Sequence, residues 1–301
     1  MRKCNTQKPK YDNFYTRLED IENICNKYKP YLKDKVVYCN CDDYTQSNFV
    51  LYLKEHFQEL ELKQLIATAY KPNENGIYFK YNGTSTKIQQ LIGDGNFNSL
   101  ECTKILKEAD IVITNPPFSL IREYIEQLYN YDKKFLIVGN QLAIINKEIF
   151  NLYRENKLFI YNGFKGNVGF FYSEYPNTVN KRNIYKEGCI RVSNIVWYTN
   201  LPTEPNKYLE LTKEYNPEYY LKYDNYNAIE VSKTNDIPID YKGVMGVPIT
   251  FLNKYNPNQF EIVGISACWD KNILKDNPNT HNPILQGKIK YTRIFIKHKH
   301  Y

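Results

Sequence analysis

A short apolar run that ends in two prolines constrains the fold of this chain more than any other stretch. Residues 111–113 (Ile-Val-Ile) are β-branched and favour a buried strand. Pro116 and Pro117 follow closely, and each fixes its own φ and disfavours helix in the residue before it. The chain therefore has to leave the strand through a rigid loop. A helix can begin only after Phe118, and Ser119 is its expected cap.

This loop carries groups that suit the chemistry of a planar amine. In open α/β sheets, loops at the carboxyl ends of parallel strands bind the ligands. The side-chain oxygen of Asn115 and the carbonyl of Pro116 are two acceptors with little freedom, and Phe118 adds a flat surface. Such acceptors would hold the exocyclic amine of adenine and favour its pyramidal form as it attacks a methyl donor. We therefore predict a catalytic loop, composed of Asn115, Pro116, Pro117 and Phe118.

The simpler interpretation is a Pro-Pro turn that merely ends a strand. The hydrophobic run before the loop and the helical pattern after it favour the functional interpretation, because a motif gains weight from the structural context that it requires.

Residues 18–156 alternate between strand and helix patterns. Strands are predicted over residues 35–40, 63–70, 77–81, 110–114 and 135–140, and helices over 18–31, 47–60, 100–109, 119–131 and 147–156. This alternation is typical of a doubly wound, mostly parallel, Rossmann-like α/β sheet with helices on both faces. Residues 1–156 are the expected catalytic domain. Thr16 is the expected cap of its first helix, with Glu19 completing a capping box.

The acidic turn after the first strand is a second candidate site. Cys41, Asp42 and Asp43 follow residues 35–40 and precede the next helix. Two carboxylates at a strand end would suit a cofactor with amino or hydroxyl groups, whereas the alternative is an ordinary helix-capping turn. The turn has no GxGxxG pattern, which disfavours a phosphate-binding loop.

Residues 157–301 have a different texture, with short β-like runs between Gly, Pro and Asn turns. This half is predicted to be a strand-rich recognition region, part of which packs back on the catalytic sheet. Its segment 163–191 mixes basic and aromatic residues, which suits phosphate contacts and base stacking. An ordinary solvated surface is the alternative. The predicted DNA-binding residues are Lys165, Phe170, Phe171, Lys181, Arg182, Lys186 and Arg191.

Composition limits the class of protein further. The net charge of +7 favours an anionic partner such as nucleic acid, although only weakly. No apolar run approaches the length of a membrane-spanning helix, so no membrane association is expected. The seven cysteines are an odd number without CxxC spacing, which favours reduced thiols in the cytoplasm over a disulfide framework or a metal site.

Several segments together resemble the DNA adenine-N6 methyltransferases that use S-adenosylmethionine, and more closely the EcoRI-type adenine-specific modification methylases. The Asn-Pro-Pro-Phe signature is shared by many amino-methylating enzymes, whereas the cysteine-containing acidic turn and the Gly-Val-Met-Gly-Val-Pro run are more specific to this family. The resemblance covers most of the chain and rests on residues 13–16, 35–43, 47–49, 93–97, 110–120, 122–124, 135–140, 222–226 and 243–251.

The resemblance implies a site-specific enzyme that methylates the N6 amine of a flipped adenine in double-stranded DNA. It implies S-adenosylmethionine as the cofactor, a monomer, and the modification half of a restriction-modification system, whose endonuclease would form no stable complex with it. The catalytic loop is carried over as predicted above. The implied cofactor-binding residues are Phe14, Tyr15, Thr16, Asn40, Cys41, Asp42, Asp43, Asp94, Asn96 and Phe97.

The chain departs from the family pattern at two places. The family usually has Asp-Phe where this chain has Asn96-Phe97, and asparagine keeps an acceptor oxygen but loses the charge. The acid that commonly ends the second strand in related enzymes is missing near Ala69 and Tyr70, where Asp42 or Asp43 could take its place.

Two other functions remain open at the level of sequence. One is methylation of RNA adenine or of a protein glutamine, since the same loop can hold any planar amine. The other is a catalytically weak homologue that binds DNA without turnover, for which the asparagine at position 96 is the reason.

Overall fold

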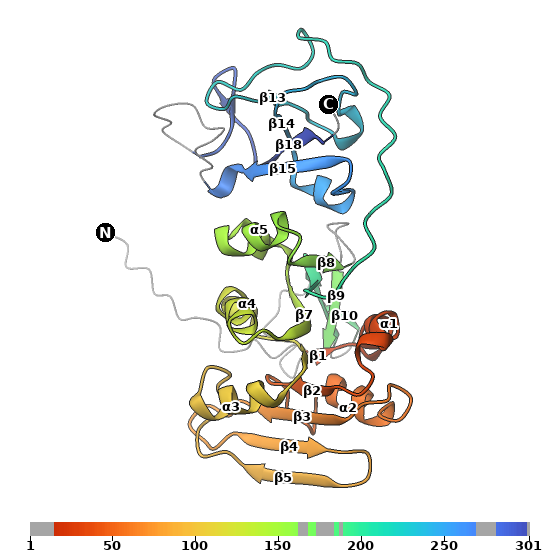
Figure 1. The fold of residues 1–301 in the computed structure, drawn as a ribbon. Helices are drawn as coiled ribbons and strands as arrows, with labels where there is room; N and C mark the ends of the chain where they lie inside the picture. The colour runs from red at the N-terminus through yellow and green to blue at the C-terminus, as the bar shows by residue number, and fades with distance from the viewer. Residues whose placement is uncertain (1–14, 162–167, 173–183, 187–188, 269–280, 300–301) are drawn as a thin grey trace, which may run out of the picture. The chain divides into compact units, whose positions relative to one another are not determined.

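The structure, a computed structural model, describes residues 15–161, 168–172, 184–186, 189–268 and 281–299 (Figure 1). The chain forms two compact units, residues 1–140 with 168–201, and residues 141–167 with 202–301. The functional boundary predicted after residue 156 stays a prediction.

The sheet of the first unit is parallel at its centre and antiparallel at its flanks. Its order is β5-β4-β3-β2-β6-β7-β12. Neighbours among β3, β2, β6 and β7 are parallel, whereas β4, β5 and β12 pair antiparallel with their neighbours. These strands are β2 (Val36–Cys39), β3 (Gln64–Ala69), β4 (Ile77–Tyr81), β5 (Thr86–Gln90), β6 (Ile111–Thr114), β7 (Lys134–Asn140) and β12 (Ile195–Thr199). The prediction of a mixed α/β fold is confirmed, and the parallel character predicted for the sheet holds for its centre.

The order of the strands reverses between β2 and β6. The chain passes from β2 to β3 in one direction and later from β6 to β7 in the other, while β2 and β6 are direct neighbours. The central strands are buried, as their apolar sequences predict, with Val37, Ile66 and Val112 fully covered. The loops that leave β2 and β6 therefore diverge from adjacent strand ends, where α/β sheets commonly bind ligands.

In the described part of this unit four helices accompany the sheet, and two of them begin at a serine cap. Ser47 caps α2, because its hydroxyl accepts hydrogen bonds from the N–H groups of Phe49 and Val50. Ser99 caps α3 in the same way, with a bond from the N–H of Cys102. The helices are α1 (Leu18–Tyr28), followed by the 3-10 turn η1 (Lys29–Tyr31), α2 (Asn48–Glu55), α3 (Leu100–Glu108) and α4 (Ile121–Asn130).

Three details of the sequence-based helix prediction were wrong. Arg17 is the residue that caps α1, without a side-chain hydrogen bond, so Thr16 is not a helix cap. Ser119 lies inside the 3-10 turn η2 (Phe118–Leu120), and α4 starts only at Ile121. Thr16 fails as a cap because it belongs to β1 and Arg17 separates it from α1, which starts at Leu18 as predicted. Ser119 fails because α4 starts two residues later than predicted. The helix predicted over residues 47–60 ends at Glu55.

A small antiparallel sheet in the first unit holds the segment before α1. Its order is β1-β9-β11-β10, formed by β1 (Tyr15–Thr16), β9 (Val168–Tyr172), β11 (Cys189–Ser193) and β10 (Ile184–Lys186). Thr16 lies opposite Phe171 in this pairing. The position of Thr16 is therefore set by a strand that comes much later in the chain.

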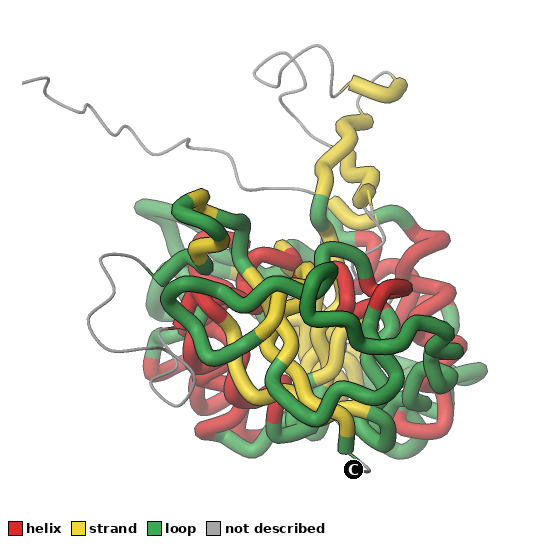
Figure 2. The backbone as a smooth tube through the Cα atoms, turned by 90° about the horizontal axis from the view of Figure 1, so that it is seen from above, coloured by secondary structure: helices red, strands yellow, loops and turns green. Residues whose placement is uncertain are grey.

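The second unit contains short strands joined by long connections. Residues 202–228 run as loops and turns, drawn in green in Figure 2. A sheet of order β13-β14-β18-β15 follows, and β16 and β17 form a separate hairpin. The elements are η3 (Gln141–Ile145), α5 (Lys147–Arg154), β8 (Phe159–Tyr161), β13 (Ile229–Glu230), η6 (Thr234–Asp236), β14 (Met245–Pro248), η7 (Ile249–Asn253), β15 (Phe260–Ile265), η8 (Ser266–Cys268), β16 (Ile284–Leu285), β17 (Lys288–Ile289) and β18 (Arg293–His298).

A buried ion pair ties this second sheet together. Arg293 donates two hydrogen bonds to the carboxylate of Glu230, from Nη2 at 2.8 Å and from Nε at 3.1 Å. Tyr223 and Ser232 donate to the same carboxylate. Burial alone would raise the pKa of Glu230, but these hydrogen bonds lower it overall. The network is fully paired, so it stabilises the unit rather than offering a reactive group.

None of the helices in the described ranges is long and apolar enough to cross a membrane.

Candidate active site

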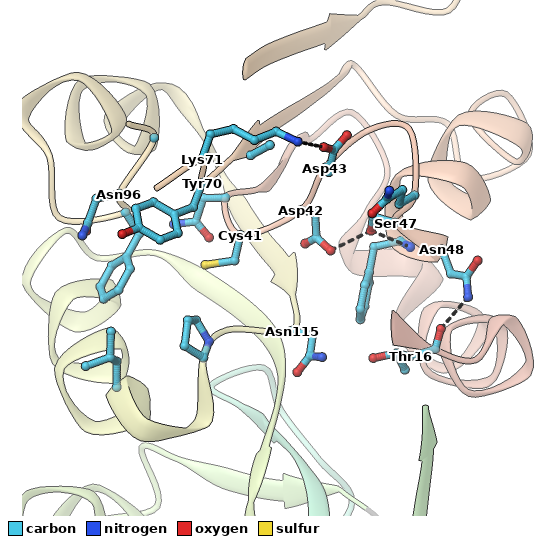
Figure 3. Close-up of a pocket in the computed structure, with 18 residues that line it drawn as sticks. Thr16, Cys41, Asp42, Asp43, Ser47, Asn48, Tyr70, Lys71, Asn96 and Asn115 are labelled. Carbon is cyan, nitrogen blue, oxygen red and sulfur yellow. Dashed lines mark hydrogen bonds and ion pairs between the residues drawn. The ribbon is translucent and has the colours of Figure 1, made fainter. Parts of the chain in front are cut away.

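A cavity of about 260 Å³ lies in the first unit, where β2, β3 and β6 end. Figure 3 shows side chains from the loops after all three strands converging on it. Asp42 and Asp43 reach it from the loop after β2, Tyr70 and Lys71 from the end of β3, and Asn115 from the loop after β6. The cavity therefore occupies the place at which the strand order reverses.

Asn40, directly after β2, has one satisfied and one unsatisfied end. Its side-chain oxygen accepts a hydrogen bond from the hydroxyl of Tyr124 on α4. Its side-chain nitrogen is buried and has no hydrogen-bond partner within the described residues. Buried polar groups are nearly always paired. This amide nitrogen in the cavity wall is therefore a candidate donor to an acceptor atom of a bound ligand.

Asp42 is buried and connects three elements. Its Oδ1 accepts from the hydroxyl of Ser47, at 2.6 Å, and its Oδ2 accepts from the hydroxyl of Thr114. Its backbone N–H donates to the carbonyl of Thr68 in β3, at 3.1 Å. Burial raises the pKa of Asp42 to about 6 even though the two hydroxyl bonds oppose the shift. The loop after β2 is thereby fixed to both neighbouring strands.

Asp43 forms an ion pair with Lys71, and both residues line the cavity. Its Oδ2 lies 2.7 Å from Nζ of Lys71, and its Oδ1 accepts from the N–H and hydroxyl of Thr45. Burial alone would raise the pKa of Asp43, but the bonds from Lys71 and Thr45 outweigh it and lower the pKa overall. Asp43 is therefore a carboxylate at neutral pH, whereas burial raises the pKa of the neighbouring Cys41 thiol, which stays protonated.

Thr16 lies on the wall that β1 contributes. Its carbonyl accepts a hydrogen bond from the side chain of Asn48 at 2.7 Å, which joins β1 to the start of α2 (Figure 3). Its own hydroxyl is buried and lacks a hydrogen-bond partner among the described residues. Together with Asn40, this gives the cavity wall two buried polar groups that are available to a bound molecule.

The glycine-rich loop at residues 93–97 packs closely on the end of β3. Gly95 has a φ of +81°, and a Cβ at this position would lie 2.3 Å from the carbonyl oxygen of Ala69. The side chain of Asp94 accepts from the N–H of Asn96, and that of Asn96 accepts from the N–H of Asn98, each at 2.9 Å. Both side-chain oxygens therefore shape the turn that leads into α3.

The structure brings most of the predicted site residues together. The predicted residues that line the cavity are Thr16, Asn40, Cys41, Asp42, Asp43, Asn96, Phe97, Asn115 and Pro117. Asp94, Pro116 and Phe118 are not among the lining residues: Pro116 is buried and Phe118 is half-buried at the start of η2.

The remaining predicted residues fall where the structure gives little or no description. Phe14, Lys165, Lys181 and Arg182 lie outside the described residues. For four others, and for Tyr15 in β1, the structure describes the strand backbone but not the side chain. These four are Phe170, Phe171, Lys186 and Arg191.

Sequence reasoning missed several lining residues, among them Ser47, Asn48, Tyr70 and Lys71. Ser47 and Asn48 begin the helix after the acidic turn, and Tyr70 and Lys71 follow the second strand. Their positions at the ends of predicted elements were the available signal. The second strand is followed by Lys71 where related enzymes have an acid nearby, and this lysine pairs with Asp43.

Comparison with known proteins identifies the family. Residues 2–299 match the family described as adenine-specific methyltransferase EcoRI. The chain is 44% identical to the type II methyltransferase M.EcoRI of Escherichia coli, with 97% of this chain and 95% of the relative aligned. It is 37% identical to the type II methyltransferase M.MpnI of Mycoplasma pneumoniae, with 97% of each chain aligned.

A further relative is the type II methyltransferase M.MgeORF184P of Mycoplasma genitalium, which is 35% identical, with 97% of this chain and 96% of the relative aligned. No solved structure matches the chain. The chain belongs to the EcoRI-type adenine-specific DNA methyltransferases, and the resemblance drawn from its motifs is confirmed.

Proposed function

We propose that the protein transfers a methyl group from S-adenosylmethionine to the N6 amine of adenine in double-stranded DNA. The observation that carries this proposal is the joint lining of one cavity by Asn115 of the catalytic loop and by the polar ends of β1 and β2. An amine held at Asn115 and a methyl donor held beside Asp42 and Asp43 would lie next to each other in one cavity. Direct transfer requires this proximity.

The cavity wall suits the proposed cofactor. S-adenosylmethionine is a sulfonium cation with hydroxyl, amino and carboxylate groups, and it supplies the reactive methyl group when bound. The buried hydroxyl of Thr16 and the amide nitrogen of Asn40 are available to bind its polar groups. Asp43 and Lys71 form an ion pair in this wall, so both a negative and a positive group would be present for the charged groups of the ligand. The aromatic rings of Phe97 and Tyr70 offer apolar surface along the same wall.

The catalytic loop would act by position and hydrogen bonding. The Asn115 side-chain oxygen and the Pro116 carbonyl would accept from the two N–H groups of the target amine, as predicted from the sequence. Positive charge develops on this nitrogen during transfer, and two fixed acceptors stabilise it without a strong general base. The 3-10 turn that begins at Phe118 follows the two prolines directly, so the loop has little freedom to move away.

The proposed substrate is duplex DNA with the target adenine turned out of the stack. The amine of a paired adenine lies inside the helix and cannot reach a buried catalytic loop, so extrusion of the base is required. The predicted basic and aromatic region beyond residue 156 would bind the duplex. We further propose a monomer in the cytoplasm, serving as the modification half of a restriction-modification system whose endonuclease forms no stable complex with it.

The proposed fold is the doubly wound sheet expected from the sequence. The reversal of strand order between β2 and β6 supports it. Connections between parallel strands are nearly always right-handed, so the crossovers through α2 and α4, which run in opposite directions, would place these helices on opposite faces.

The test is incubation of purified protein with methyl-labelled S-adenosylmethionine and unmethylated genomic DNA, followed by separation of the nucleosides. Label in N6-methyladenine supports the proposal, and sequencing of the methylated positions then gives the recognised site. Parallel reactions contain RNA or total protein in place of DNA. Label that enters RNA or protein but not DNA would contradict DNA as the substrate. Label that enters none of the three would contradict catalysis itself.

A further inference from the structure

The segment at residues 222–226, one of those on which the family resemblance rests, has no part in the cavity described above, but it holds another element in place. It belongs to the second unit, whose β16 and β17 form a two-stranded hairpin. Asp224, Asn225 and Tyr226 each bind backbone groups of residues 281–287. Three consecutive residues therefore fix one hairpin.

Asp224 stabilises the turn of the hairpin. Its carboxylate accepts from the N–H groups of Gln286, at 3.3 Å, and Gly287, at 2.8 Å. These two residues have φ values of +50° and +73°. A two-residue hairpin turn with positive φ at both positions matches the right-handed twist of its strands, but it costs conformational energy at a residue other than glycine. The Asp224 carboxylate offsets that cost at Gln286.

Asn225 and Tyr226 attach the base of the hairpin to the core. The Asn225 side chain accepts from the N–H of Ile284 at 2.8 Å and donates to the carbonyl of Asn282 at 2.9 Å. The fully buried Tyr226 donates its hydroxyl to the carbonyl of His281 at 2.6 Å. Its ring packs on Phe295 of β18, with centroids 4.6 Å apart. The hairpin is thus rigid at both its turn and its base.

The second strand of this hairpin and the residues after it carry both lysines and exposed apolar side chains. The side chain of Ile289 is 65% exposed and that of Tyr291 is 89% exposed. Lys288 is exposed between the turn and Ile289, and Lys290 follows. Residues 281–292 contain no Asp or Glu. Among the described residues, no side-chain interaction within the hairpin uses these four, which are the two residues of β17 and the two that follow it. We call them the hairpin tip: Lys288, Ile289, Lys290 and Tyr291.

We propose that the hairpin tip is a DNA-contacting element and that Asp224 and Asn225 are positioning residues for it. This inference rests on the proposed function, because it takes duplex DNA as the partner. A two-stranded β-ribbon fits the major groove of B-form DNA. Lys288 and Lys290 would bind backbone phosphates, while Ile289 and Tyr291 would contact the apolar surface of sugars and bases. The charge of the tip is complementary to that of the partner.

The first test compares duplex binding by the full-length protein and two double variants over a series of salt concentrations. Lys288→Ala/Lys290→Ala removes the two lysines of the tip. Lys207→Ala/Lys233→Ala removes two exposed lysines elsewhere in the same unit and is the matched control. Each lost phosphate contact lowers the slope of log affinity against log salt by about 1, so the tip variant should lose about 2 and the control almost nothing.

The second test addresses the positioning role. Asp224→Ala should weaken DNA binding several-fold, because the turn loses its acceptor and the tip is no longer held. Asp224→Asn keeps an acceptor oxygen and should restore most of the affinity. Binding of S-adenosylmethionine should be the same in all variants, since its cavity lies in the other unit. A merely structural role would lower the melting temperature of Asp224→Ala without changing DNA affinity at a temperature where the protein is folded.

The outcomes separate this inference from the proposed function. Suppose that the wild-type protein methylates DNA and that the tip variant binds DNA as tightly as wild type. This result would overturn the hairpin proposal and leave the proposed function intact. An equal loss of affinity in the tip variant and the control would overturn it as well. Wild-type protein that binds no duplex DNA would overturn both proposals, because the tip would then need another partner.

Discussion

The hydroxyl of Thr114 donates a hydrogen bond to the buried carboxylate of Asp42. Thr114 is the last residue of β6 and directly precedes Asn115, whereas Asp42 follows β2. The other oxygen of Asp42 accepts from Ser47, the cap of α2. One carboxylate thus connects the loop proposed to bind the cofactor with the loop proposed to bind the target amine. Asp42 is therefore expected to set the distance between the two ligands.

Replacement of Thr114 with Val should impair this connection. Valine has a similar shape but leaves Oδ2 of Asp42 with one hydrogen bond fewer, which destabilises a buried carboxylate by about 1–3 kcal/mol. We expect a several-fold fall in kcat, with a smaller change in the affinity for S-adenosylmethionine. Thr114→Ser restores a donor and should recover most of the rate. A Thr114→Val enzyme with wild-type kcat would show that the bond has no role in positioning.

Asp42 should also make the stability of the protein depend on pH. Its pKa in the folded state is about 6, above its ordinary value of 3.8, so the folded protein binds this proton more tightly than the unfolded chain does. The free energy of unfolding should therefore fall as the pH rises from about 4 to about 6, by on the order of 2–3 kcal/mol from this group. Urea unfolding of wild type and Asp42→Asn across pH 4 to 7 measures the difference, and parallel curves would contradict it.

Thr16→Val should separate stability from cofactor binding. The variant removes a buried hydroxyl that has no hydrogen-bond partner within the described residues. Loss of one hydrogen bond to the cofactor should weaken S-adenosylmethionine binding by roughly 3- to 10-fold, while the melting temperature should stay the same or rise. Calorimetric titration and thermal melting measure the two quantities, with Thr16→Ser as the control that keeps the hydroxyl. Weaker binding accompanied by a lower melting temperature would indicate a structural role instead.

Gly95→Ala should be far more damaging than Gly93→Ala. A Cβ at position 95 meets the carbonyl oxygen of Ala69 at 2.3 Å on a backbone of positive φ, whereas a Cβ at position 93 has no heavy atom within 4 Å. We expect Gly95→Ala to lower the free energy of unfolding by more than about 2 kcal/mol and to weaken cofactor binding, because the loop must move off β3. Urea unfolding of the two variants checks this, and equal losses would contradict it.

The central strands and the rigid loop after β6 could be predicted because their signals are local. The apolar run of β6 and the two prolines after it determine a strand and a rigid loop within a few residues. The acidic turn after β2 was found for the same reason, since a buried strand followed by two carboxylates leaves few alternatives. These segments account for most of the predicted lining residues.

Thr16 and the second unit show why the rest was not predictable. Thr16 has the sequence context of a helix cap, but β1 pairs with β9, and no local pattern reveals a partner so far along the chain. The strand β14 contains Gly246, whose lack of a side chain makes room for the ring of Tyr223. Such close packing depends on tertiary contacts, which cannot be predicted from the sequence of a short, glycine-containing strand.

Methyl transfer by Asn115→Ala, measured beside wild type with labelled S-adenosylmethionine and duplex DNA, tests the proposed mechanism most directly. The variant loses an acceptor for the target amine, so the transfer rate should fall by roughly 10²- to 10³-fold, while binding of DNA and of S-adenosylmethionine stays close to wild type. A variant that methylates adenine at the wild-type rate would contradict the assignment of Asn115. Wild-type protein that binds both ligands but forms no N6-methyladenine would show instead that the fold serves DNA binding without turnover.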